Sequence, residues 1–389
     1  MFRLLLLSGI AALACAQDLA TQADRYVQSW VRDSQFRGVV LIAKDGQPLL
    51  RKGYGLANAE WNIPNSPETK FRLGSITKQF TAVAVLQLAE NGKLKLEDPV
   101  KTHYADAPAA WDKITIHHLL NHTSGIKSYT GLPGFFAKQS RDRRTPTEIV
   151  KLTQDMPLDF EPGEKFAYNN TGYVLLGAVI EKASGQSYES YLRQNIFEPL
   201  GMADSGYDSF RAILPSRATG YNPDGTHADY LDMSLPHAAG SLYSTVDDLL
   251  KWNQALATEK LLTKESLAKM TTPSSPRENK YAYGLVIDEL KGHRIHAHGG
   301  DINGFSTFLS RFPDDGITIA VLGNQSNPAP ERIANALGRM AFGETVEPRP
   351  LVTRVDVPTA KLDQLASRYE LGPNLHQGGR TMKAKRLPD

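Results

Sequence analysis

The sequence has little of several features that would each indicate a particular class of protein. Its 389 residues include one cysteine, Cys15, so a disulfide framework and a zinc site built on cysteines are excluded. Lys and Arg number 44 against 42 Asp and Glu, so the chain lacks the basic excess that is typical of nucleic-acid binders. We therefore expect no nucleic-acid partner.

Long apolar runs and internal repeats are also missing. The only apolar run of note, residues 4–13, is too short to span a bilayer as a helix, so no stable membrane span is expected. An apolar content of 41% with balanced charge excludes a disordered chain. The length is sufficient for one large or two medium domains with real hydrophobic cores.

The first 16 residues have the pattern of a secretory signal peptide. Arg3 precedes the apolar run, and Ala14-Cys15-Ala16 gives a small-x-small cleavage site. We expect cleavage after Ala16 and a secreted or periplasmic protein without cysteine. A lipoprotein anchored at Cys15 is the disfavoured alternative, because Ala12 stands where a lipoprotein signal favours Leu.

Strand patterns cluster near both ends of the main body, and helical patterns fill its middle. The expected strands are 38–44, 48–53, 283–290, 294–298, 305–312 and 317–322, and the expected helices are 76–90, 171–183, 188–196 and 246–256, the last capped by Ser244 or Thr245. These patterns predict an α+β fold: one antiparallel sheet built from both ends and flanked by helices, with a mainly helical lobe inserted at about 95–240. A cleft between sheet and lobe is the expected place for a site.

The segment Gly74-Ser75-Ile76-Thr77-Lys78 opens one of the expected helices. Ser75 and Lys78 are three residues apart, so a helix places them on one face. At a helix start the Ser75 N–H can bind an oxyanion, and the helix dipole disfavours the ammonium form of Lys78. The pair predicts a nucleophile and its base. Alone, it also fits a serine cap followed by a surface lysine.

The segment Tyr168-Asn169-Asn170 precedes the helix expected from residue 171. A tyrosine in such a loop can hold its phenol near Lys78, where we expect each group to lower the other's proton affinity. Asn170 can donate its amide to a substrate carbonyl. The alternative is that Asn170 caps the helix beside a packed aromatic ring.

The segment His298-Gly299-Gly300-Asp301 stands at the end of an expected strand, shortly before Gly304. Paired glycines let another backbone or a ligand approach closely, so the Asp301 N–H is expected to complete an oxyanion hole with Ser75. The alternative is a tight turn between two edge strands. Three such motifs on helix start, loop and strand are far less expected by chance than any one of them.

Together these motifs resemble the serine β-lactamases, the penicillin-recognising DD-peptidases and related esterases. The greatest similarity is to the branch of class C β-lactamases, DD-carboxypeptidases, D-aminopeptidases and family VIII carboxylesterases. It covers roughly residues 25–345 and includes Leu119-Leu120-Asn121-His122-Thr123-Ser124-Gly125, Pro199-Leu200-Gly201-Met202 and Ala238-Ala239-Gly240-Ser241. The resemblance implies a β-lactamase/DD-peptidase-like fold for residues 17–347.

The resemblance also implies a role for each site residue. Ser75 would be the acylated nucleophile, Lys78 would assist its deprotonation, and Tyr168 would be the general base and acid. The substrate would be bound by Asn170, His298, Gly299, Gly300 and Asp301. No metal or cofactor is needed for this chemistry.

His298 departs from the pattern of the β-lactamases, which usually carry Lys in a Lys-Thr-Gly motif at this place. An imidazole is charged only below about pH 6.5 unless it is perturbed, so it offers a substrate carboxylate less positive charge. We therefore expect a serine hydrolase for an ester or a D-amino-acid amide or peptide. A β-lactamase is the first alternative, and a non-catalytic relative that binds peptidoglycan or a partner is the second.

Two weaker patterns remain. His117, His118 and His122 resemble a metal-binding group, but the HExxH glutamate is missing, so no metal is expected. Residues 348–389 are expected to be a linker and a short tail. Residues 365–371 resemble the first strand of the accessory β domain of relatives, which this tail is too short to complete.

Overall fold

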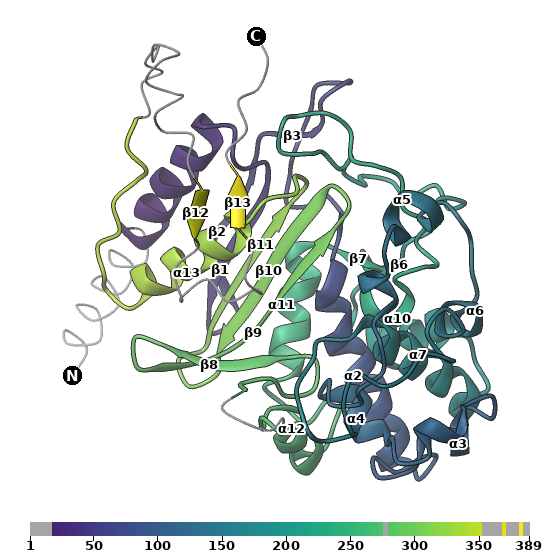
Figure 1. Ribbon diagram of the computed structural model, residues 1–389. Helices are drawn as coiled ribbons and strands as arrows, with labels where there is room; N and C mark the ends of the chain where they lie inside the picture. The colour runs from purple at the N-terminus through teal and green to yellow at the C-terminus, as the bar shows by residue number, and fades with distance from the viewer. Residues whose placement is uncertain (1–17, 275–278, 352–367, 371–380, 384–389) are drawn as a thin grey trace, which may run out of the picture. The chain divides into compact units, whose positions relative to one another are not determined.

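The structure is a computed structural model that describes residues 18–274, 279–351, 368–370 and 381–383 (Figure 1). The expected signal peptide, residues 1–16, lies outside these residues. The chain forms two compact units, Met1–Arg349 and Pro350–Asp389. The first contains a six-stranded antiparallel sheet in the order β2-β1-β11-β10-β9-β8. Its strands are β1 (Gly38–Lys44), β2 (Gln47–Tyr54), β8 (Val286–Leu290), β9 (His293–Ile302), β10 (Phe305–Phe312) and β11 (Ile317–Gly323).

Strand β1 shows why the sheet has a core on each face. It is apolar through Ala43, and all of its residues except Lys44 are buried. Because successive side chains point to opposite faces, Val39 and Leu41 belong to one hydrophobic cluster, and Val40 and Ile42 belong to the other. The expected antiparallel sheet, formed by strands from both ends of the chain, is confirmed.

Helices cover both faces of the sheet (Figure 1). The helix at residues 18–32 and α13 (Ala329–Ala341) share a hydrophobic cluster with one face. On the other face, α2 (Thr77–Glu90) and α11 (Val246–Ala255) belong to the larger cluster, which continues into the helical lobe. Thr245 caps α11 by accepting the Asp248 N–H.

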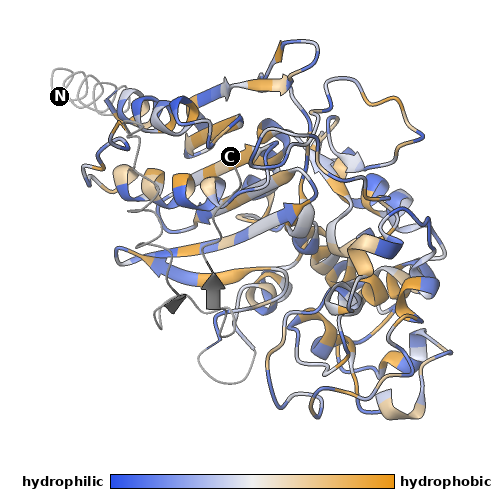
Figure 2. Ribbon diagram, turned by 45° about the horizontal axis from the view of Figure 1, so that its top comes forward, coloured by the Kyte–Doolittle hydropathy of each residue, from blue (hydrophilic) through white to orange (hydrophobic). Residues whose placement is uncertain are grey.

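The lobe is mainly helical and is packed around α7. Its helices are α3 (Val100–His103), α4 (Ile116–Leu120), α5 (Phe135–Gln139), α6 (Pro146–Val150), α7 (Asn170–Ser184), α8 (Tyr188–Leu192), α9 (Glu198–Leu200) and α10 (His237–Gly240), with 3-10 turns η2 (Ala109–Trp111) and η3 (Tyr129–Gly131). The helix expected at 188–196 ends at Leu192 and continues as a π-helix, η4 (Arg193–Phe197). Figure 2 shows apolar residues along the inner helices and polar residues on many connecting loops.

Short strands complete the fold. A three-stranded sheet joins β5 (Phe71–Arg72), β7 (Leu242–Ser244) and β6 (Gly206–Tyr207), and β3 (Leu56–Asn58) pairs with β4 (Ile63–Pro64). Helix α12 (Lys264–Met270) lies between α11 and β8 in sequence. In the second unit β12 (Arg368–Glu370) pairs with β13 (Thr381–Lys383); the rest of the strand expected at 365–371 lies outside the described residues.

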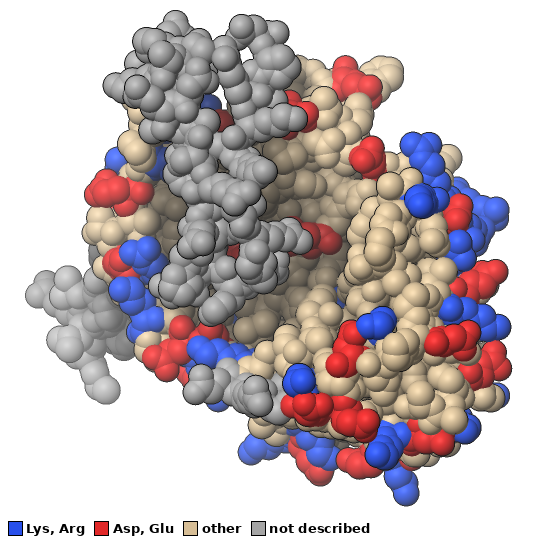
Figure 3. Space-filling view, viewed as in Figure 1, with Lys and Arg blue, Asp and Glu red and all other residues tan. Residues whose placement is uncertain are grey.

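The surface agrees with the balanced composition. On the face seen in Figure 3, Lys and Arg are intermixed with Asp and Glu over the helical lobe. Among the described residues, none of the helices has both the length and the apolar character needed to cross a membrane.

Candidate active site

Ser75 lies in a 3-10 turn, η1 (Gly74–Ile76), that leads directly into α2. Ser75 is half-buried between buried neighbours. Gly74 has a φ of 53°, a left-handed conformation that glycine adopts without strain. A methyl group at Gly74 would lie 2.9 Å from the backbone nitrogen of Asp301. The turn that carries Ser75 therefore packs directly against β9.

Gly300 is the second position where this contact needs a glycine. A methyl group there would lie 1.9 Å from the carbonyl oxygen of Leu73. The prediction that the strand ends at His298 is wrong, because β9 continues in register with β10 to Ile302. Gly300 thus lies inside a strand and lets its backbone approach the Ser75 turn, which brings the Asp301 N–H to this side of the site.

The Lys78 side chain is completely buried, and its Nζ has three polar neighbours. Nζ lies 3.1 Å from Ser75 Oγ, 2.9 Å from Asn170 Oδ1 and 2.9 Å from the Ala239 carbonyl oxygen. Burial lowers the pKa of Lys78 well below its usual value. A neutral amine has two hydrogens, and the two oxygens that can only accept use both of them. Its lone pair is then left for the Ser75 hydroxyl.

Tyr168 lies beside this amine, with its ring centroid 4.7 Å from Lys78 Nζ. Although the residue is 40% exposed, burial around the hydroxyl raises its pKa, a hydrogen bond with Ser75 lowers it by less, and the Asp301 carboxylate raises it further. The prediction that Lys78 would lower the proton affinity of this phenol is wrong, because desolvation dominates. Tyr168 is therefore protonated at neutral pH, with its hydroxyl beside Ser75.

The start of α7 holds the amide that faces Lys78. Asn169 is the cap residue and accepts the Gly172 N–H at 2.8 Å, so the alternative in which Asn170 caps the helix is wrong. Asn170 is instead the first helical residue. Its Nδ2 donates to Thr130 Oγ1 at 3.1 Å, which turns its Oδ1 toward Lys78.

His298 is buried in β9, and both of its ring nitrogens have protein partners. Nδ1 lies 2.6 Å from the carbonyl oxygen of Gly299, and Nε2 lies 3.0 Å from the Tyr281 hydroxyl. Nδ1 therefore donates and Nε2 accepts. Burial and the nearby Lys78 lower the pKa of His298 to about 4. At neutral pH this imidazole carries no positive charge toward a substrate.

The structure brings seven of the eight residues predicted for the site close together, whereas a side chain at Gly299 would face Phe308 on the other side of the strand. It also adds groups that the sequence reasoning missed. The Ala239 carbonyl accepts a hydrogen bond from the Lys78 amine, and Thr130 Oγ1 accepts one from the Asn170 amide. Tyr281 holds His298, and His122 packs against Tyr168. The Ala238–Ser241 and Leu119–Gly125 stretches carried the only available signals for Ala239 and His122, as parts of the family resemblance.

The two other histidines of the candidate metal-binding group, His117 and His118, have structural contacts. His117 Nδ1 lies 2.6 Å from the Tyr283 hydroxyl, and His118 completes a capping box with Thr115 at the start of α4. No group of three or more metal-ligating side chains is arranged to hold a metal ion within the described part of the chain.

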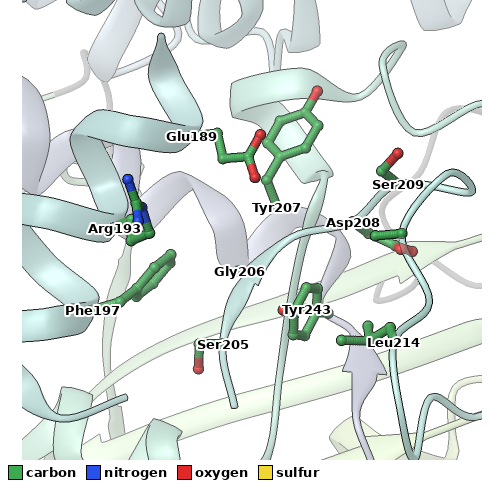
Figure 4. Close-up of a pocket in the computed structure, with 11 residues that line it drawn as sticks. Glu189, Arg193, Phe197, Ser205, Gly206, Tyr207, Asp208, Ser209, Leu214 and Tyr243 are labelled. Carbon is green, nitrogen blue, oxygen red and sulfur yellow. The ribbon is translucent and has the colours of Figure 1, made fainter. Parts of the chain in front are cut away.

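A separate pocket of about 170 Å3 lies between η4 and β6 (Figure 4). Its carboxylate Asp208 is held by Arg72 Nε at 2.6 Å and Arg217 Nη1 at 2.7 Å. Its Ser205 bonds to Ser244 and to the Asp248 carboxylate, which also accepts the Asp204 N–H and pairs with Lys251. None of the predicted site residues lines this pocket, so the chemistry lies elsewhere.

Comparison with known proteins places the chain in a family. Residues 23–343 match the family described as Beta-lactamase. The putative penicillin-binding protein PbpX of Bacillus subtilis (strain 168) is 32% identical over 299 residues, which cover 76% of this chain and 72% of that protein. The chain therefore belongs to the beta-lactamase family.

Solved structures agree with this membership. The octameric penicillin-binding protein homologue from Pyrococcus abyssi has a TM-score of 0.73 at 33% identity, covering 84% of this chain and 78% of that chain. A D-stereospecific amidohydrolase from Streptomyces sp. has a TM-score of 0.69 at 30% identity, covering 85% and 98%. The β-lactamase/DD-peptidase-like fold is confirmed, and the chain is a serine hydrolase of this family.

Proposed function

We propose that the protein hydrolyses esters or D-amino-acid amides and peptides through an acyl-enzyme at Ser75. One observation carries the proposal: Lys78 Nζ is buried 3.1 Å from Ser75 Oγ and is held there by the Asn170 Oδ1 and the Ala239 carbonyl oxygen, each 2.9 Å away. A buried neutral amine in this position is a base ready to accept the serine proton.

In the proposed reaction Ser75 Oγ attacks the substrate carbonyl carbon while its proton passes to Lys78 Nζ. The N–H groups of Ser75 and Asp301 bind the oxyanion. Tyr168 gives its hydroxyl proton to the leaving alcohol or amine, and the Lys78 ammonium restores it. Water then adds to the ester carbonyl, and a water proton returns through Tyr168 and Lys78 to Ser75 Oγ as the acid leaves.

The environment of His298 supports esters and D-amino-acid amides as substrates ahead of β-lactams. A β-lactam antibiotic carries a carboxylate close to its reactive carbonyl. His298 is neutral at pH 7 with both nitrogens engaged, and the exposed Asp301 adds a negative charge nearby. The similarity to a D-stereospecific amidohydrolase favours the amide of a D-amino acid within this class.

Two further parts of the proposal concern location and competence. We propose that the protein is secreted or periplasmic, on the pattern of residues 1–16. We propose an enzyme instead of a non-catalytic binder of peptidoglycan or a partner, because Ser75, Lys78, Tyr168 and Asn170 are present and in mutual contact.

The test is a set of paired rates on the mature protein, residues 17–389. It compares p-nitrophenyl butyrate, a D-amino-acid p-nitroanilide and nitrocefin, with Ser75→Ala as the blank. We expect turnover of the ester or the anilide, very slow nitrocefin hydrolysis, and no turnover by Ser75→Ala. Hydrolysis retained in Ser75→Ala, or no labelling of Ser75 by a fluorophosphonate, would contradict the proposal.

A substitution at His298 separates the two substrate classes. His298→Lys places an ammonium where the neutral imidazole stands, so we expect the ratio of nitrocefin to ester turnover to rise. His298→Gln is the matched control, because it is polar and uncharged. Fast nitrocefin hydrolysis by the unchanged protein would instead favour the alternative, that the protein is a β-lactamase.

A further inference from the structure

His122 is a buried histidine that takes no part in the proposed reaction. It is 1% exposed and follows α4 with a φ of 62°, in the left-handed region that few residues other than glycine adopt. Its carbonyl oxygen accepts the Ala167 N–H at 2.9 Å, and its Nδ1 accepts the Asn169 N–H at 3.1 Å. These two N–H groups belong to the residues on either side of Tyr168.

The His122 ring also contacts Tyr168 directly. Their ring centroids are 4.4 Å apart, and the rings of Tyr281 and Tyr173 lie 4.6 Å and 5.0 Å from that of His122. Because Nδ1 accepts a hydrogen bond, the neutral ring carries its proton on Nε2. That nitrogen has no hydrogen-bond partner among the described residues and lies in an aromatic enclosure.

The charge state of His122 agrees with this arrangement. Burial is the largest cause that lowers the pKa of His122 well below the usual value. The ring therefore stays neutral, and Nδ1 remains an acceptor. Tyr168 itself stands in a loop without regular secondary structure, and the next residue, Asn169, also caps α7 and donates to the Ile126 carbonyl.

We propose that His122 is a positioning residue that clamps the loop on both sides of Tyr168 and so holds the phenol over Ser75 and Lys78. The inference rests on the proposed function of these three residues. It assigns His122 no contact with substrate: the clamp acts through the placement of Tyr168, by two backbone hydrogen bonds and one ring contact.

Two variants separate the acceptor from the ring. His122→Phe keeps an aromatic ring but leaves the buried Asn169 N–H without its acceptor. His122→Asn loses the ring but carries an oxygen at the place of Nδ1, and asparagine tolerates a left-handed backbone. We expect kcat for the ester to fall about 100-fold in His122→Phe with a smaller change in KM, and to be largely retained in His122→Asn.

A double-mutant cycle tests whether His122 acts through Tyr168. In the Tyr168→Phe background, His122→Phe should cost less than about threefold in kcat, because the hydroxyl that it positions is already gone. Val40→Ala, on the opposite face of the sheet, is the control for a general loss of stability and should leave kcat unchanged. Equal losses in the two backgrounds, or equal losses for His122→Phe and His122→Asn, would overturn the inference.

Crystal structures of the two variants give a readout that needs no substrate. We expect the Tyr168 hydroxyl to move away from Ser75 in His122→Phe and to keep its place in His122→Asn. An unmoved Tyr168 in His122→Phe would overturn the inference. Ester turnover that survives in Ser75→Ala would instead overturn the proposed function, so the two failures are distinguishable.

Discussion

The two faces of the central sheet are packed by helices of different chemistry. The buried residues of α13, on one face, are all apolar or glycine and proline. Helix α2, on the other face, buries Thr77, Lys78, Gln79 and Thr81 among its apolar residues. The first face supplies apolar burial, and the second face carries the polar groups from which a reaction site is built.

The polar residues of α2 teach how such a face is organised. Thr81 Oγ1 donates to the Ala238 carbonyl at 2.7 Å, Gln79 Oε1 accepts the Trp252 indole N–H at 2.9 Å, and Thr77 Oγ1 accepts the Leu242 N–H at 3.2 Å. These bonds hold the neighbouring segments in register with α2, including the one that presents the Ala239 carbonyl to Lys78. Buried polar side chains whose hydrogen bonds are all made fix the relative positions of these segments more specifically than apolar contacts alone would.

The largest expected effect is the loss of activity in Lys78→Met, a variant on the polar face of the sheet. The variant keeps a long side chain but removes the base, so kcat for the ester should fall by about 10³-fold or more. Steady-state rates on the purified variant measure this loss. Lys52→Met, at a half-exposed lysine paired with Asp24, is the control and should keep the rate. Activity within tenfold of the unchanged protein would remove Lys78 from the proposed reaction.

The second prediction concerns the apolar face. Leu337 of α13 is completely buried, so Leu337→Ala leaves a cavity and should lower the free energy of unfolding by about 2–5 kcal/mol. Guanidinium unfolding curves measure the loss, and kcat of the folded protein should stay within twofold. A large fall in kcat at full folding would show that this face is coupled to the reaction, and the contrast between the faces would not hold.

The third prediction is a pH dependence of stability, which is small within any one pH unit. Lys78 has a lowered pKa in the folded protein, so between that pKa and about 10.4 the unfolded chain binds one more proton than the folded chain. The contribution of Lys78 to the free energy of unfolding therefore rises with pH, by up to about 1.4 kcal/mol per pH unit. Unfolding curves at several pH values should show a rise that Lys78→Met lacks. Parallel curves for the two proteins would mean that Lys78 is charged in the folded state.

Much of the fold was predictable because its signals are local. The apolar runs of β1 and β11 and the turns at Asp45-Gly46 and Asp315-Gly316 mark the sheet, and the three motifs mark the chain segments that meet at the site. The end of β9 was missed because two glycines in a row are typical of a turn. Here the second of them, Gly300, permits the contact with Leu73, which only the tertiary structure supplies.

The proton states of the site could not be read from the sequence. The raised pKa of Tyr168 and the lowered pKa of His298 depend on burial by residues far away in the chain. The clamp by His122 depends on two loops lying side by side, and neither loop has a periodic pattern. The resemblance marked residues 119–125 as a similar stretch but gave no reason for the histidine.

The central pairing of β1 with β11 has a consequence for how activity arises. Gly38 pairs with Gly323, so the sheet closes only after nearly the whole domain has been synthesised. Pairings between such distant segments form slowly, because the entropy cost of closing a long loop comes before the strands gain any contact energy. The strand that carries Asp301 belongs to the same late group as β10 and β11. A growing chain therefore contains its serine and lysine early, but the strand that carries Asp301 joins them only when synthesis of the domain is nearly complete.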